Sequence, residues 1–170
     1  MESVVESPDS GQGSEPGNSA ASTTSQSADA GLWDPCGLPE SALSAEGMDP
    51  ASKESGIADV DFTDAGWNIC QWKATAGWYR LAVLAGPPSL DEVEARPDYA
   101  EYTPTTVGAR RGVQFRSPGA THDLMCYLAV EIPNGTVTFR ASARASVGAK
   151  EDMCTVVGQH ASGLASFLPE

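Results

Sequence analysis

Four widely spaced cysteines constrain the fold of this 170-residue chain more than any other feature of its sequence. They are Cys36, Cys70, Cys126 and Cys154. No two of them form a CxxC or CxxH pair, so a zinc site would have to be assembled from four distant positions. An even number of separated cysteines instead favours two disulfides, which form in an oxidising compartment outside the cytoplasm. We therefore expect two disulfides, no metal and no cofactor.

The pairing of these cysteines decides whether they are structural or reactive. Cys36 and Cys154 both lie at predicted helix starts, where a free thiol would have a lowered pKa. The alternative function is therefore a thiol-dependent redox protein or sensor that uses Cys36 or Cys154. The main prediction ties each of them to a strand cysteine. We favour Cys36–Cys70 with Cys126–Cys154, although Cys36–Cys154 with Cys70–Cys126 fits the sequence almost as well.

The composition changes near residue 31. Residues 1–31 are rich in Ser, Gly, Ala and Thr with scattered acids, and they contain no Lys or Arg. Such a segment buries too little apolar surface to offset its ordering entropy, so we predict a disordered tether. Residues 32–170 are long enough for one domain, and we predict a single disulfide-stapled α+β domain there.

The hydrophobic periodicity of the second segment predicts the α+β class. Helical patterns occur at 39–48, 89–95 and 151–168, and strand patterns at 57–62, 67–74, 77–86, 112–117, 122–132 and 136–144. Asn134-Gly135 predicts a tight hairpin turn between the last two strands. We expect an antiparallel sheet of five to six strands with the N- and C-terminal helices packed on it, as an α-β-α sandwich.

The charge of the chain limits its partners. The sequence has 23 acidic and 10 basic residues, for a net charge of −13. Nucleic acids and anionic membrane surfaces select basic patches, so we expect neither as a direct partner. The sequence shows neither an apolar run long enough to span a bilayer nor a secretory signal peptide. We expect a monomer.

Tryptophan and arginine side chains are the candidate ligand-binding residues. Trp67, Trp72 and Trp78 fall in one predicted hairpin region, where core packing is the usual role of tryptophan. On an exposed concave face they would line an apolar pocket. Arg110 and Arg111 are the densest positive charge, and they would bind a carboxylate or phosphate, or pair with neighbouring acids.

The sequence contains no recognisable catalytic motif. It has no GxSxG nucleophile elbow, no glycine-rich phosphate loop and no complete EF-hand loop. We expect His122 to be solvated in a polar loop and His160 to be half-buried beside the apolar face of the last helix. We therefore predict no enzyme active site.

An ordered set of motifs resembles a known family. The motifs are "DPCGLPESAL", "CQW", "GVQFRS", "CYLAVEIPNGTVTF" and "MCTVVGQHASGLASFLP", which span about residues 33–169. This pattern resembles the actinobacterial four-cysteine envelope lipoproteins that are grouped as a family of unknown function. More loosely, the order of elements resembles the sandwiches of photosystem extrinsic and Mog-like proteins, a likeness at the level of fold alone.

The resemblance implies export, a lipid-modified cysteine and a flexible tether to the outer face of the cell membrane. We recognise neither the signal peptide nor the lipid-modified cysteine in this chain, whereas residues 1–31 have the composition of the tether. The family has no assigned reaction, so no catalytic residue is implied. We expect a non-enzymatic cell-envelope domain that binds an envelope protein or an apolar, lipid-like ligand.

Overall fold

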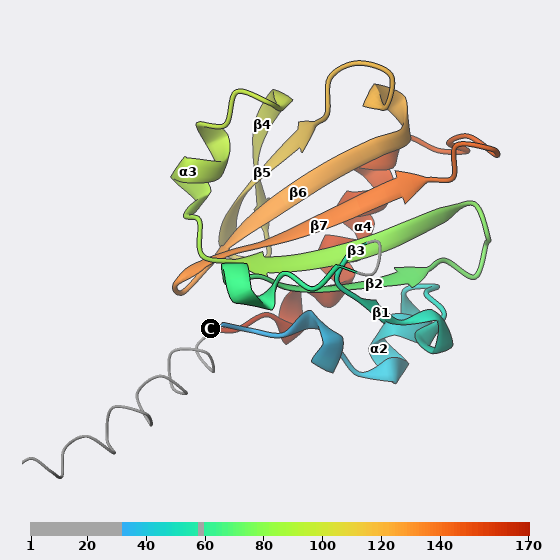
Figure 1. Ribbon diagram of the computed structural model, residues 1–170, viewed down its shortest axis with the longest axis horizontal. Helices are drawn as coiled ribbons and strands as arrows, with labels where there is room; N and C mark the ends of the chain where they lie inside the picture. Colours follow the sequence, from blue (N-terminus) through green and yellow to red (C-terminus); the bar gives the residue numbers. More distant parts are fainter. Residues whose placement is uncertain (1–31, 58–59) are drawn as a thin grey trace, which may run out of the picture. The chain divides into compact units, whose positions relative to one another are not determined.

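The computed structural model describes residues 32–57 and 60–170 (Figure 1). The tether predicted at residues 1–31 lies outside the described residues. Residues Trp33–Glu170 form one compact unit, and the account below concerns this unit.

The domain is built on one antiparallel sheet. Within the described residues the sheet has seven strands, in the order β1-β2-β3-β7-β6-β5-β4. The strands are β1 (Glu54–Ser55), β2 (Asn68–Lys73), β3 (Tyr79–Gly86), β4 (Ala100–Val107), β5 (Arg110–Arg116), β6 (Met125–Ile132) and β7 (Gly135–Ala143). The α+β class is confirmed, but the expected number of strands, five to six, was too low.

The helices are short except for the last one. They are α2 (Glu40–Ala45), α3 (Leu90–Glu94) and α4 (Met153–Leu164), with 3₁₀ segments η2 (Pro35–Gly37), η3 (Pro50–Ser52), η4 (Thr63–Ala65), η5 (His122–Leu124) and η6 (Ala165–Phe167). Ser89 and Glu92 form the reciprocal hydrogen bonds of a capping box at the start of α3. In the described part of the chain, α4 is the only helix of more than two turns.

One face of the sheet carries the main core. Cys70, Val83, Phe139 and Leu128 are register partners across β2, β3, β7 and β6, and all four are buried. Because alternate residues share a face, Cys126 lies on the same face as Leu128. Helix α4 packs there against β6 and β7, and Figure 1 shows it behind these strands.

The N-terminal segment places its predicted apolar residues inward. Leu38, Leu43 and Met48 are all buried, as the pattern of the segment predicts. Met48 forms an isolated bridge to Ala74 at the end of β2. The helix in this segment, α2, has only six residues, so the expected pair of terminal helices is reduced to one long helix, α4.

The opposite face carries a smaller core under α3. Leu90 and Val93 of α3 pack with Val113, Phe115 and Ala129 of the sheet. Three tyrosines surround this cluster: Tyr99, Tyr102 and Tyr127. The helix on this face is therefore the five-residue α3 rather than one of the terminal helices.

Two elements differ from the sequence prediction for identifiable reasons. Strand β4 contains Pro104, which indicates a loop when read from sequence, but β4 is the last strand of the sheet order and an edge strand tolerates proline. Of the strand predicted at 57–62, the described residues, 57 and 60–62, form no strand, and an isolated bridge joins Ile57 to Val60. The hairpin of β6 and β7 is confirmed, with Asn134 at φ 71° in its turn.

Candidate functional site

Both cysteine pairs form disulfides. Cys36 is bonded to Cys70 and Cys126 to Cys154, which confirms the favoured pairing. The first bridge joins η2 to β2, and the second joins β6 to the first turn of α4. Each bridge therefore fixes a terminal segment of the domain to the same face of the sheet.

The disulfides leave no free thiol. All four cysteines of the chain are paired, and Cys70 and Cys126 have no exposed surface. The thiolate is the reactive form of cysteine, so neither Cys36 nor Cys154 is available as a nucleophile in this state.

The tryptophans belong to the interior. Trp72 is completely buried and Trp78 is 6% exposed, so both pack in the core. Trp67 is half-buried and lies over Gly86, where a Cβ would overlap the indole ring. Trp67 also lines a cavity of about 120 Å³ together with polar residues that include Asp34 and Asp61.

Arg110 and Arg111 lie at a depression between two hairpin turns. The depression measures about 520 Å³ and is lined by Ala109, Arg110, Arg111, Glu131, Ile132 and Pro133. Arg111 forms ion pairs with Asp91 at 3.1 Å and Glu131 at 3.3 Å. Arg110 donates instead to the main-chain oxygens of Glu131 and Leu168. Arg111 is thus electrically paired, and Arg110 keeps an uncompensated charge within the described residues.

An exposed phenylalanine precedes a residue near the C-terminus that Arg110 contacts. Phe167 precedes Leu168, whose carbonyl accepts the hydrogen bond from Arg110 at 3.3 Å. Phe167 is 40% exposed, which is unusual for a phenylalanine in a soluble domain. The end of η6 therefore places an exposed phenylalanine one residue before a main-chain contact of Arg110.

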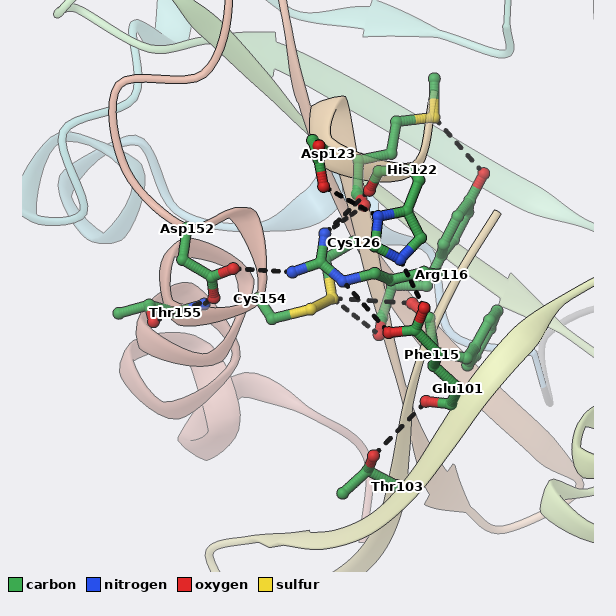
Figure 2. A network of polar contacts seen from close by, with 12 residues as sticks. Glu101, Thr103, Phe115, Arg116, His122, Asp123, Cys126, Asp152, Cys154 and Thr155 are labelled. Atoms are coloured by element: carbon green, nitrogen blue, oxygen red, sulfur yellow. Dashed lines mark hydrogen bonds and ion pairs between the residues drawn. A yellow bond between two sulfur atoms is a disulfide. The ribbon is translucent and has the colours of Figure 1, made fainter. Parts of the chain in front are cut away.

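A polar network that sequence reasoning missed surrounds the second disulfide (Figure 2). Its centre is Arg116, the last residue of β5, whose side chain is 12% exposed. Arg116 donates to the carbonyls of His122 at 2.8 Å and Met125 at 3.4 Å, and to the Asp152 carboxylate at 2.7 Å. Because Asp152 is the N-cap of α4, this arginine ties β5 and η5 to the start of the helix.

The N-cap aspartate is held in its charged form. Burial tends to raise the pKa of Asp152, but hydrogen bonds from Thr155 and Arg116 outweigh it and lower the pKa. A charged carboxylate at a helix N-terminus also interacts favourably with the helix dipole. This network therefore stabilises the attachment of α4.

His122 is held between two carboxylates in the same network. Its Nδ1 bonds Asp123 at 2.8 Å, and its Nε2 bonds Glu101. Glu101 has φ 59° and lies where the pairing of β4 and β5 shifts register, so the bulge directs this carboxylate towards the ring. The carboxylates of Asp123 and Glu101, as hydrogen-bond acceptors for the ring, raise the pKa of His122. His122 is therefore partly solvated, as expected, but it is also paired with two carboxylates.

His160 is also fully engaged. It is 5% exposed, its Nδ1 bonds Glu46 at 3.0 Å, and its Nε2 bonds the Tyr79 hydroxyl at 2.8 Å. The contact to Glu46 joins α4 to the residue that caps α2. Burial raises the pKa of Tyr79, and the nearby Glu151 and Glu46 raise it further. These interactions connect the N-terminal segment, α4 and β3.

The described residues hold no other recognisable chemical centre. No cluster of His, Cys, Asp and Glu in residues 32–57 and 60–170 has the geometry to bind a metal ion. In the same residues, no helix is long and apolar enough to cross a membrane. No short sequence pattern could have revealed the networks of His122 and His160, because their partners Glu101 and Glu46 are distant along the chain.

Comparison with known proteins gives one informative match. A family model described as a protein of unknown function matches residues 3–166. Neither the curated proteins nor the solved structures contain a significant match to this chain. The match covers almost the whole sequence and includes all four disulfide-bonded cysteines. The chain therefore belongs to the DUF3558 family of proteins of unknown function.

Proposed function

We propose that this domain is a non-enzymatic binding domain of the cell envelope, and that its ligand is another protein rather than an apolar small molecule. The observation that carries the proposal is the surface around Arg110: a depression of about 520 Å³ whose Arg110 also donates a hydrogen bond to the carbonyl of Leu168, the residue after exposed Phe167. Arginine and aromatic side chains are enriched among the residues that dominate protein–protein binding energy. We call Arg110, Pro133 and Phe167 the turn surface.

The alternative ligand, an apolar molecule, has less support. Binding of an apolar ligand would need tryptophans that line a cavity, but Trp72 and Trp78 are packed in the core. The only tryptophan of the three at a described cavity is Trp67, and that cavity has mixed polar and apolar walls and a volume of about 120 Å³. Such a volume is well below the several hundred Å³ of typical ligand pockets.

The proposal includes no enzymatic role because the hydrogen bonds of the two histidines occupy their ring nitrogens. The chain has two, and both ring nitrogens of each are engaged by neighbouring side chains. A histidine that acts as a general base needs a ring nitrogen that faces the proton it removes. In this arrangement neither His122 nor His160 presents one.

Attachment to the membrane is the second part of the proposal. The two disulfides indicate an extracytoplasmic location. The resemblance to envelope lipoproteins supports a lipid anchor joined to the domain through residues 1–31. Mass spectrometry of the protein isolated from its own membrane tests this point, because a lipid-modified N-terminal cysteine adds the mass of its acyl chains.

Site-specific photo-crosslinking in the native host tests the protein partner. A benzophenone amino acid replaces Phe167 on the turn surface, and a matched control replaces Val147, which is 47% exposed in the loop after β7. We expect one discrete crosslinked protein from position 167, and its loss when Arg110→Glu is added. Equal crosslinking from both positions, or a yield that Arg110→Glu leaves unchanged, would contradict the proposal. If native mass spectrometry of the purified protein instead shows the added mass of a bound small molecule, the apolar ligand is favoured.

A further inference from the structure

A second cavity concentrates positive charge in this acidic chain. It measures about 210 Å³, lies where β2 turns into β3, and is lined by Lys73, Ala74, Gly77, Tyr79, Arg80 and Arg144. Three of the ten basic residues of the chain therefore surround one small cavity, although the net charge is −13. At physiological ionic strength charges are screened beyond roughly 8 Å, so the local cations dominate the potential there.

Two of the three cations are held in position before any ligand binds. The Arg144 guanidinium donates to the carbonyl of Gly77 at 3.0 Å, and the main-chain N–H of Arg144 donates to Trp78 at 2.8 Å. The Arg80 guanidinium lies 3.4 Å from both the Glu54 carboxylate and the Gln71 side-chain oxygen. A pre-positioned donor loses less entropy when it binds, so such an arrangement favours ligand recognition.

The charges at the cavity are not balanced within the domain. Glu54 offsets the charge of Arg80. Lys73 and Arg144 have no carboxylate within 4 Å among the described residues. Counted by ion pairs within 4 Å in the described part of the domain, Lys73 and Arg144 are therefore two unpaired positive charges at the cavity. A phosphate monoester carries a charge of about −1.5 to −2 at pH 7 and has three acceptor oxygens, whereas a carboxylate carries a single charge.

From this match of charge we propose that the cavity is a binding site for a phosphate monoester group. Its volume, about 210 Å³, is below the roughly 300 Å³ at which pockets begin to enclose whole drug-sized ligands. It therefore accepts a phosphate and its nearest atoms but not an acyl chain. The phosphate group can belong to a soluble phosphate ester or to the headgroup of a lipid whose chains stay in a membrane.

This site is separate from the turn surface. Gly86 pairs with Thr136 at the start of β7, and Tyr79 pairs with Ala143 at its end. The β6–β7 turn and the β2–β3 turn therefore lie at opposite ends of the sheet, as Figure 1 shows. The phosphate proposal goes beyond the proposed protein partner, and either can fail without the other.

Titration with glycerol 3-phosphate tests the proposal in solution. We would follow amide shifts of the full chain by NMR at constant ionic strength and compare Lys73→Gln/Arg144→Gln with Lys53→Gln/Lys150→Gln. The control removes the same two charges from lysines that are exposed and lie outside the cavity. We expect saturable shifts around the β2–β3 turn and a loss of about tenfold in affinity for the first variant, as two charge-assisted contacts disappear. The control should change the affinity less than about twofold.

Vesicles distinguish the two sources of the phosphate group. We would measure sedimentation of the chain with phosphatidylcholine vesicles that contain phosphatidic acid. Binding that the Lys73→Gln/Arg144→Gln variant abolishes and glycerol 3-phosphate displaces would assign the site to a lipid headgroup. Saturable binding of glycerol 3-phosphate alone would assign it to a soluble ester. No saturable binding of either probe, or equal affinity in both double variants, would overturn the proposal.

Discussion

Removal of either disulfide should destabilise the domain by a similar and calculable amount. The Cys36–Cys70 bridge closes a loop with a sequence separation of 34, and the Cys126–Cys154 bridge one of 28. In the chain-entropy account, loops of these lengths correspond to about 3.8 and about 3.6 kcal/mol at 25 °C. The two loops do not overlap in sequence, so the losses should add to about 7 kcal/mol. Small domains have total stabilities of about 5–15 kcal/mol, so the loss of both bridges should unfold much of the protein.

Urea denaturation of the two paired variants, Cys36→Ala/Cys70→Ala and Cys126→Ala/Cys154→Ala, measures these losses. The fluorescence of the buried tryptophans reports unfolding, and the wild-type chain reduced with a phosphine keeps all four sulfur atoms as a control. If either paired variant loses less than about 1 kcal/mol of unfolding free energy, and the slope of that free energy against urea concentration is unchanged, the entropy argument is refuted.

Three further predictions concern the polar networks. Carboxylate partners raise the pKa of His122, so its contribution to stability should be complete below about pH 6.5 and lost as pH rises through the pKa of the folded state. The His122→Gln variant should therefore show a weaker pH dependence of the melting temperature across that window. Arg116→Met should cost about 2 kcal/mol in urea unfolding because the Asp152 carboxylate and two carbonyls lose their hydrogen bonds to the guanidinium, and Arg116→Ala should not be milder. Tyr79→Phe should cost about 1 kcal/mol because buried His160 loses a partner, and an unchanged unfolding midpoint would contradict this role.

The features that could be predicted from sequence are those encoded by nearby residues. Alternation of apolar side chains identified β2, β6 and β7, and a run of aromatic and aliphatic residues identified β3. The Ser89 capping box and the apolar face of α4 are equally local signals. The disulfide pairing was favoured because each bridge joins segments that are close along the chain, with separations of 34 and 28 residues.

The features that were missed depend on long-range contacts. Pro104 made β4 resemble a loop, and only the position of β4 at the sheet edge explains why proline is tolerated. The Arg116 network brings together residues 36 positions apart in the chain, in the pair formed with Asp152. A polar residue in an exposed loop has the same sequence pattern whether or not such a partner exists. The role of Arg110 was left open for the same reason.

The arrangement of the domain explains why its two candidate binding surfaces can be tested without disturbing the fold. Both disulfides and α4 lie on one face of the sheet, so the main stabilising contacts are concentrated on that face. Lys73 and Arg144 are exposed at one end, and Phe167 is exposed beyond the last helix. Surface substitutions away from buried networks usually change stability by less than about 0.5 kcal/mol. A binding defect at these positions can therefore be separated from unfolding, whereas a substitution at buried Trp72 would change both.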